Sequence, residues 1–301
     1  MANAVGAVVV SGIRARANSF CTIAACTVAL LPVCVSAEEG FDTEHIFGFM
    51  IGTDVGNLGE REFQSETTGS FGKNGGRYRA VGQEFELEFV PFRNFRVEVG
   101  SAFASHLISN VPGLEDQRRL SWQGGSLDLR YRFLDRETAP FGLTFATEFH
   151  AHRVDETTAE KVRSFGTEFR LAFDRELVPD RVIAAFNLIY EPEWTRLIGS
   201  GVMERESTAG AALGVMAQLR SGFLLGGEAR YLRKYEGAAL EELAGQALFI
   251  GPTAYFQLSK RSRLTASWSV QAWGRPAGTT ASLDLGNFER HQARLVFGVN
   301  F

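Results

Sequence analysis

Apolar and polar residues alternate along most of this chain, and this period of two restricts the fold more than any other feature. Phe85, Leu87 and Phe89, for example, alternate with glutamates. Successive side chains of a β-strand point to opposite faces, so the pattern predicts strands with one apolar and one polar face. It recurs in residues 46–53, 78–90, 95–105, 120–133, 141–153, 162–173, 182–191, 208–219, 223–233, 246–258, 264–273 and 289–301. We therefore predict an all-β chain of twelve strands.

The predicted connections differ in length at the two ends of the strands. Those after even-numbered strands are short: 91–94, 134–140, 175–180, 220–222 and 259–262. Those after odd-numbered strands are mostly longer: 54–77, 106–118, 154–161, 192–204, 236–245 and 274–287, of which 154–161 is barely so. This difference is typical of transmembrane barrels with periplasmic turns and extracellular loops. The sequence thus predicts a single 12-stranded antiparallel up-and-down transmembrane β-barrel with both termini on the periplasmic side.

A soluble β-sandwich or lipocalin-like barrel is the alternative, and alternation alone does not say which face points inward. Twelve strands are too many for a packed lipocalin-type interior, which favours the membrane barrel. Residues 38–301 contain no apolar run of the ~18 residues that a transmembrane helix needs. With a net charge of −4 and no basic face, nucleic acid is not an expected partner.

The N-terminal residues have the pattern of a secretory signal peptide. Arg14 and Arg16 precede an uncharged run that ends at Val35-Ser36-Ala37, and small residues at such an exit mark a cleavage site. We expect cleavage after Ala37, which leaves residues 38–301 as the barrel domain. Pro32 argues against a retained membrane anchor, and Val33 argues against a lipoprotein signal.

The cysteines all lie within this leader, at Cys21, Cys26 and Cys34. The expected mature chain therefore has no disulfide, no thiolate metal site and no cysteine nucleophile.

The final residues continue the alternation and end the chain on an aromatic side chain. Leu295, Phe297, Val299 and Phe301 form the apolar set. This ending resembles the C-terminal targeting strand of bacterial outer-membrane β-barrels. The resemblance implies that the four residues are an assembly signal, and that the partners include outer-membrane lipids and the outer-membrane assembly machinery. The chain is also loosely similar to mid-sized transport barrels associated with aromatic-compound degradation, but no diagnostic motif is matched and no residues are carried over.

If the apolar faces meet lipid, the polar faces line the lumen. The residues expected there are Glu84, Glu86, Glu88, Arg96, Glu98, Asp128, Arg130, Arg132, Glu148, His150, His152, Glu168, Arg170, Glu228, Arg230, Arg290 and Arg294. The short turn 91–94 predicts that Glu88 lies roughly across from Arg96. Such mixed charges either form a ladder of salt bridges that keeps a narrow interior folded, or set up a field that passes polar solutes. The two interpretations are compatible.

The histidines of the chain are not expected to form a metal site or the site of a lipid hydrolase. His150 and His152 share a face with Glu148, a spacing that suits a divalent metal, but solvated or carboxylate-paired histidines are the expected state. A lipid hydrolase needs a Ser–His pair, whereas Ser105 and His106 point to opposite faces and His291 has no matching serine.

The glycines of the predicted loop 54–77 do not match a phosphate-binding loop, because Asn74 follows Lys73 and no helix comes after it. A mobile surface loop is expected instead, and we expect no cofactor.

The function that this sequence predicts is passive passage of small polar or amphipathic solutes through a monomeric outer-membrane channel. A lipid-modifying enzyme of the outer membrane is one alternative, and a plugged structural or adhesive barrel is the other.

Overall fold

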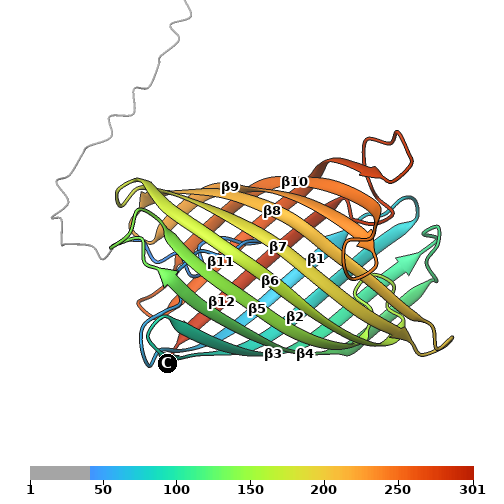
Figure 1. Cartoon of the computed structure of the whole chain (residues 1–301), viewed down its shortest axis with the longest axis horizontal. Helices are drawn as coiled ribbons and strands as arrows, with labels where there is room; N and C mark the ends of the chain where they lie inside the picture. Colours follow the sequence, from blue (N-terminus) through green and yellow to red (C-terminus); the bar gives the residue numbers. More distant parts are fainter. Residues whose placement is uncertain (1–40) are drawn as a thin grey trace, which may run out of the picture. The chain divides into compact units, whose positions relative to one another are not determined.

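The structure, a computed structural model, describes residues 41–301, and twelve strands of this part of the chain form one closed antiparallel barrel (Figure 1). The predicted fold class is confirmed. The predicted signal peptide lies outside the described residues. The strands are β1 (Arg61–Phe71), β2 (Arg77–Phe92), β3 (Phe95–Ser109), β4 (Gln117–Leu134), β5 (Gly142–Val154), β6 (Lys161–Val178), β7 (Val182–Leu197), β8 (Met203–Arg220), β9 (Phe223–Glu236), β10 (Glu242–Gln257), β11 (Ser262–Pro276) and β12 (His291–Asn300).

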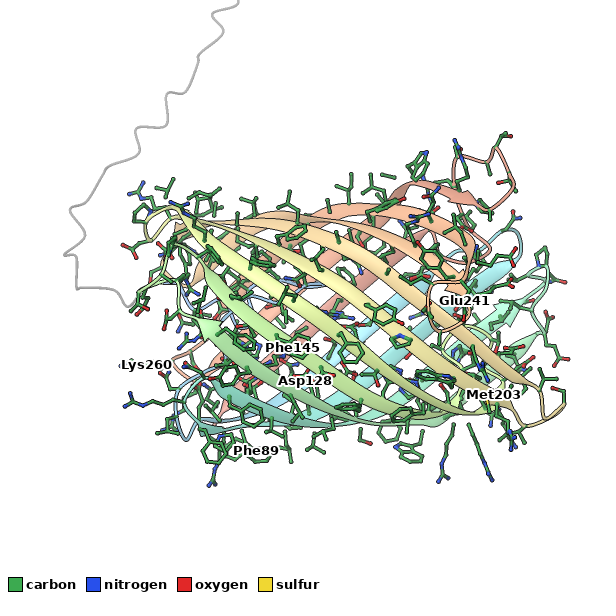
Figure 2. The ribbon with its side chains drawn as sticks, viewed as in Figure 1. Phe89, Asp128, Phe145, Met203, Glu241 and Lys260 are labelled. Atoms are coloured by element: carbon green, nitrogen blue, oxygen red, sulfur yellow. The ribbon has the colours of Figure 1, made fainter. Side chains whose placement is uncertain are left out.

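The apolar faces of the strands point outward. Phe85 and Leu87 of β2 are 41% and 44% exposed, whereas Glu88 is 3% exposed and faces the lumen. Phe89 points away from the barrel wall (Figure 2). Ring centroids of Phe63 and Phe85 are 6.1 Å apart, so aromatic side chains of β1 and β2 pack across the outer surface. An outer surface of this kind is stable in lipid, which excludes the soluble barrel.

The closed sheet pairs the backbone groups of its strands with one another, as a lipid environment requires. Within residues 41–301, no helix is long and apolar enough to cross a membrane.

The predicted first strand, 46–53, is wrong. These residues lie inside the barrel. The first strand is β1, which lies within the predicted mobile loop 54–77. The apolar residues of 46–53 do not alternate strictly, because a segment enclosed by the barrel has neighbours on all sides. In β1 the outward set includes Ser65, Thr67 and Gly69, so its amphipathic pattern is weak. As a consequence β12 closes the barrel against β1 and not against 46–53.

The two rims differ less than the sequence predicts. The connections after odd-numbered strands are 72–76, 110–116, 155–160, 198–202, 237–241 and 277–290, of which only the last is long. Most strands extend beyond their predicted ends, through charged residues that obscure the alternation. Lys260, in the turn between β10 and β11, lies at one rim, and Met203 and Glu241 lie at the other (Figure 2). The C-terminus lies at the rim of Lys260, which we call the turn rim (Figure 1).

Candidate functional site

Residues 41–56 lie in the lumen near the turn rim, and we call them the lumenal segment. Ile46, Phe47 and Met50 are at most 5% exposed. They pack in one cluster with Ile183 of β7 and Met216 of β8. The inner wall is therefore apolar at this place, in contrast to the charged wall on the opposite strands, and it binds the apolar side chains of the segment.

The backbone of the lumenal segment is bound by side chains of the wall. The Glu228 carboxylate accepts hydrogen bonds from the N–H groups of Gly48 and Phe49, at 2.6 and 2.9 Å. The Asn187 side chain accepts one from the N–H of Ile51 and donates one to its carbonyl oxygen, both at 2.9 Å. Buried backbone polar groups must be paired, and a segment without strand neighbours needs such partners. These side chains take the place of a β-ladder.

The end of the segment nearest β1 is held by charged groups. The Asp54 carboxylate pairs with Arg132 at 3.0 Å and with Arg136 at 2.6 Å. Asp174 of β6, which is 2% exposed, accepts hydrogen bonds from the hydroxyl groups of Thr43 and Thr53, both at 2.7 Å. Charge-assisted hydrogen bonds are the stronger class, so this network fixes both ends of the segment to the same part of the wall.

Aromatic and basic groups meet at Phe49. The guanidinium groups of Arg230 and Arg294 lie 4.0 and 5.0 Å from the centre of its ring. A ring between two cations gains cation–π attraction, which is largest when the groups are desolvated. Both arginines belong to the set predicted to line the lumen, and both contact the lumenal segment.

Glu44 and His45 place two titratable groups of the segment against β1, β2 and β3. Arg96 is fully buried and pairs with Glu44, Glu88 and Glu98. Burial, together with the nearby Arg263, lowers the pKa of His45 to about 3, so this imidazole is neutral near pH 7. The strand register places Glu98 directly opposite Glu88, and the predicted Glu88–Arg96 pair forms diagonally, with an N–O distance of 3.2 Å.

A cavity of about 320 Å³ lies between the lumenal segment and the rim opposite the turn rim. Its floor includes Phe47, Gly48 and Met50 of the segment. The charged side chains that line it, among the described residues, are nine glutamates and four arginines: Glu44, Glu66, Glu84, Glu86, Glu98, Glu148, Glu156, Glu168, Glu191, Arg96, Arg130, Arg170 and Arg294. A cavity with this lining is suited to polar or cationic molecules and not to apolar ones.

The residues predicted to line the lumen fall into two groups. Those that line the cavity are Glu84, Glu86, Arg96, Glu98, Arg130, Glu148, His150, His152, Glu168, Arg170 and Arg294. Those that do not are Glu88, Asp128, Arg132, Glu228, Arg230 and Arg290. Most of the second group contact the lumenal segment or a neighbouring charge, as Arg132 contacts Asp54 and Asp128 contacts Arg130.

His150 and His152 stack on one another, with ring centroids 4.8 Å apart. Nδ1 of His152 lies 3.8 Å from the Glu156 carboxylate. His150 lies near Glu191 and Glu193. The carboxylates beside these histidines therefore come from other strands and loops, and not from Glu148 of their own strand.

Three residues of the predicted assembly signal are on the outer face of β12, and Phe301 follows the strand directly. Leu295, Phe297 and Phe301 are 45%, 37% and 66% exposed. Val299 is partly exposed.

Sequence reasoning missed the wall residues that hold the lumenal segment. Asp174 and Asn187 occupy inward positions of β6 and β7, so continuing the alternation would have placed them in the lumen. Glu44, His45 and Asp54 carry no comparable signal, because the segment that contains them has no regular period.

Several solved structures are similar to this chain. The COG4313 outer membrane channel from Pseudomonas putida F1 is similar with a TM-score of 0.57 and 12% identity, over 83% of this chain and 98% of that chain. The translocator domain of autotransporter NalP from Neisseria meningitidis gives a TM-score of 0.43 and 15% identity, over 83% and 91%. The CymD monoaromatic hydrocarbon channel gives 0.39 and 9%, over 81% and 89%. The similarity to the COG4313 channel shows that the fold is that of an outer-membrane β-barrel.

Sequence comparison identifies the family to which the chain belongs. Residues 39–301 match the family described as "Family of unknown function (DUF6662)". No curated protein matches the sequence.

Proposed function

We propose that this chain, which belongs to the DUF6662 family, is an outer-membrane channel for passive passage of small polar or amphipathic solutes. In the described conformation the lumenal segment closes the lumen near the turn rim, and solutes pass when the segment leaves its position. The observation that carries this proposal is the charged cavity of about 320 Å³, which is bounded at one end by a segment outside the barrel sheet.

The lumenal segment is suited to reversible closure. It is attached to the wall by side-chain hydrogen bonds, ion pairs and packing, and it contributes no strand to the sheet. Its departure therefore leaves all twelve strand pairings intact. The polar groups that it releases, such as Glu228 and Asn187, would then face water in a lumen that is already hydrophilic.

Conductance in planar bilayers tests the proposal. In the double variant Glu228→Gln/Asn187→Ala, the first change removes the charge and one of the two acceptor oxygens that bind the N–H groups of Gly48 and Phe49, and the second removes the side chain that binds Ile51. We expect refolded wild-type protein to conduct rarely and the double variant to have an open probability at least tenfold higher. A matched control is Thr208→Ala. Thr208 is an inward residue of β8, and within the described chain its side chain forms no hydrogen bond with residues 41–56. Absence of conductance from both proteins at every voltage would contradict the channel.

A plugged structural or adhesive barrel is the second candidate, and the filled turn-rim end of the lumen favours it. It predicts no conductance in the double variant and surface binding that depends on the loops, of which 277–290 is the longest among the described residues. Proteoliposomes that contain a channel swell in a solution of small sugars, whereas those that contain a plugged barrel do not.

We propose no catalytic role. Ser105 is exposed on the outer face of β3, whereas His106 is buried in the lumen, where Nε2 lies 2.8 Å from the Glu156 carbonyl oxygen. Absence of lipid hydrolysis by wild-type protein in mixed micelles is the expected result.

We also propose a monomer in contact with outer-membrane lipids, with the turn rim on the periplasmic side. The assembly machinery is proposed to read Leu295, Phe297, Val299 and Phe301, because the first three lie on the outer face of β12 and Phe301 is exposed directly after it.

A further inference from the structure

Glu44 and His45 of the lumenal segment meet two glutamates of the barrel wall in a buried cluster. Nε2 of His45 lies 3.5 Å from Oε2 of Glu44, 3.8 Å from Oε2 of Glu88 and 3.8 Å from Oε1 of Glu62. The side chains are at most 10% exposed. We call these four residues the seam cluster, since two belong to the segment and two to the wall.

Arg96 orients two of the carboxylates toward the imidazole. Glu44 and Glu88 each turn Oε1 to the Arg96 guanidinium and leave Oε2 facing His45. Groups that hold the free oxygen of a ligand carboxylate are typical of the outer shell of metal sites. The cluster therefore has oriented oxygen atoms and one nitrogen atom that converge on a common point.

Two of the atoms that the proposed ligands contribute lack hydrogen-bond partners. Within the described residues, Nε2 of His45 and Oε2 of Glu88 are fully buried and have no hydrogen-bond partner. Leaving such groups unpaired is costly, more so when one is charged. The position that they surround is thus incomplete without a further group.

The charges of the surrounding side chains indicate the sign and magnitude of the charge that this further group carries. Four carboxylates, of Glu44, Glu62, Glu88 and Glu98, face two guanidinium groups, of Arg96 and Arg263, among the described residues of this region. Arg130 also reaches Glu98, but it pairs with Asp128 at 2.8 Å and their charges cancel. A formal charge of −2 remains in a buried place, and one divalent cation neutralises it.

The spacing is also that of a metal site. With ligand bonds of 2.0–2.2 Å, tetrahedral ligand atoms lie about 3.4 Å apart. The distances from Nε2 of His45 to the oxygen atoms are 3.5–3.8 Å, and the ligand atoms of Glu44, His45 and Glu88 all lie within 4.8 Å of one another, so side-chain shifts alone bring them to this spacing. Imidazole with carboxylates suits cations such as Zn²⁺ and Mn²⁺.

We propose that the seam cluster binds one divalent transition-metal cation through Glu44, His45 and Glu88, with Glu62 beside them. The cation joins the lumenal segment to β2, so its binding stabilises the closed position of the segment. Any ligand that binds only one conformation stabilises that conformation. The site does not depend on what the barrel conducts.

Titration of the refolded full chain with Mn²⁺ and with Zn²⁺ after chelator treatment tests the site. Calorimetry is expected to show one site per chain in the wild type, with affinity reduced at least tenfold in His45→Ala and in Glu88→Gln. Glu148→Gln is the matched control, because it removes one glutamate charge from the lumen at a position outside the seam cluster. We expect its affinity to stay within twofold of the wild type. The Mn²⁺ complex should also show nitrogen hyperfine coupling that His45→Ala abolishes.

Three outcomes would overturn the site: no saturable binding by the wild type, wild-type affinity in His45→Ala, or equal losses in Glu148→Gln and Glu88→Gln. The last result would mean that an acidic lumen attracts cations without a defined site. If Glu88→Gln does not fold, His45→Ala decides alone, since His45 is outside the sheet. Because binding is measured without conductance, failure of the cation site and failure of the channel are separate results.

Discussion

At the scale of single residues, Arg96 shows what alternation along a strand can and cannot predict. Its position in the lumen and its pairing with Glu88 follow from the period of β3 and from the short turn before it. Its contact with Glu44 does not follow, because Glu44 belongs to a segment without a period and lies 52 positions away in the chain. Local patterns indicate which way a side chain points, and the partner it meets depends on distant parts of the chain.

Replacement of Arg96 by methionine is expected to destabilise the barrel. The guanidinium is fully buried among three carboxylates, and its loss leaves buried negative charges without compensation. Removing one partner of a buried ion pair costs about 3–5 kcal/mol. Urea unfolding in lipid vesicles, followed by tryptophan fluorescence, measures the loss. The control is Arg118→Met at an exposed position of β4, which should change stability by less than about 0.5 kcal/mol. Equal effects of the two changes would refute the role of Arg96.

At the scale of elements, the lumenal segment and β1 exchange the roles that the sequence suggests. Residues 46–53 are apolar enough to be mistaken for a strand, and the outward set of β1 is too polar and small to be recognised as one. The other eleven predicted strands overlap β2 to β12. The two errors have different causes. A segment enclosed by a barrel has no polar and apolar side, and the outward side of β1 carries small and polar residues that weaken its alternation.

Gly214 of β8 provides the space in which the lumenal segment packs. A Cβ atom there would lie 2.7 Å from Sδ of Met50 and 2.8 Å from a ring carbon of Phe47. Gly214→Val should therefore displace the segment without removing any wall hydrogen bond. We expect chymotrypsin to cleave after Phe47 or Phe49 at least tenfold faster than in the wild type.

Ala211→Val, an outward change on the same strand, is the control for Gly214→Val and should leave the cleavage rate unchanged. Cleavage of Gly214→Val at the wild-type rate would show that the segment is held too strongly for one side chain to displace.

At the scale of the whole molecule, the excess of carboxylates in the cavity sets a preference for charge. Nine glutamates and four arginines of the described chain line it. Rings of acidic side chains select cations, because they raise the local cation concentration and repel anions. The pore opened by Glu228→Gln/Asn187→Ala should therefore prefer K⁺ to Cl⁻ by about tenfold. Adding Glu148→Gln and Glu191→Gln should reduce this ratio, as measured by reversal potentials in a salt gradient. An anion-selective pore would contradict the assignment of the cavity to the conduction path.

The sequence by itself determined the all-β class, which side chains of most strands share a face, and the closed barrel; its count of twelve agrees because the false strand 46–53 replaces the missed β1. The first two follow from a period of two, which is a local property, since neighbouring side chains of a strand must point to opposite faces. The barrel follows from the number of strands and the lengths of their connections. Only the tertiary structure decided which face meets lipid, where the first strand begins and that residues 41–56 occupy the lumen. Those features depend on contacts such as that of Gly48 with Glu228, 180 positions apart, which exist only after closure of the sheet has created an interior.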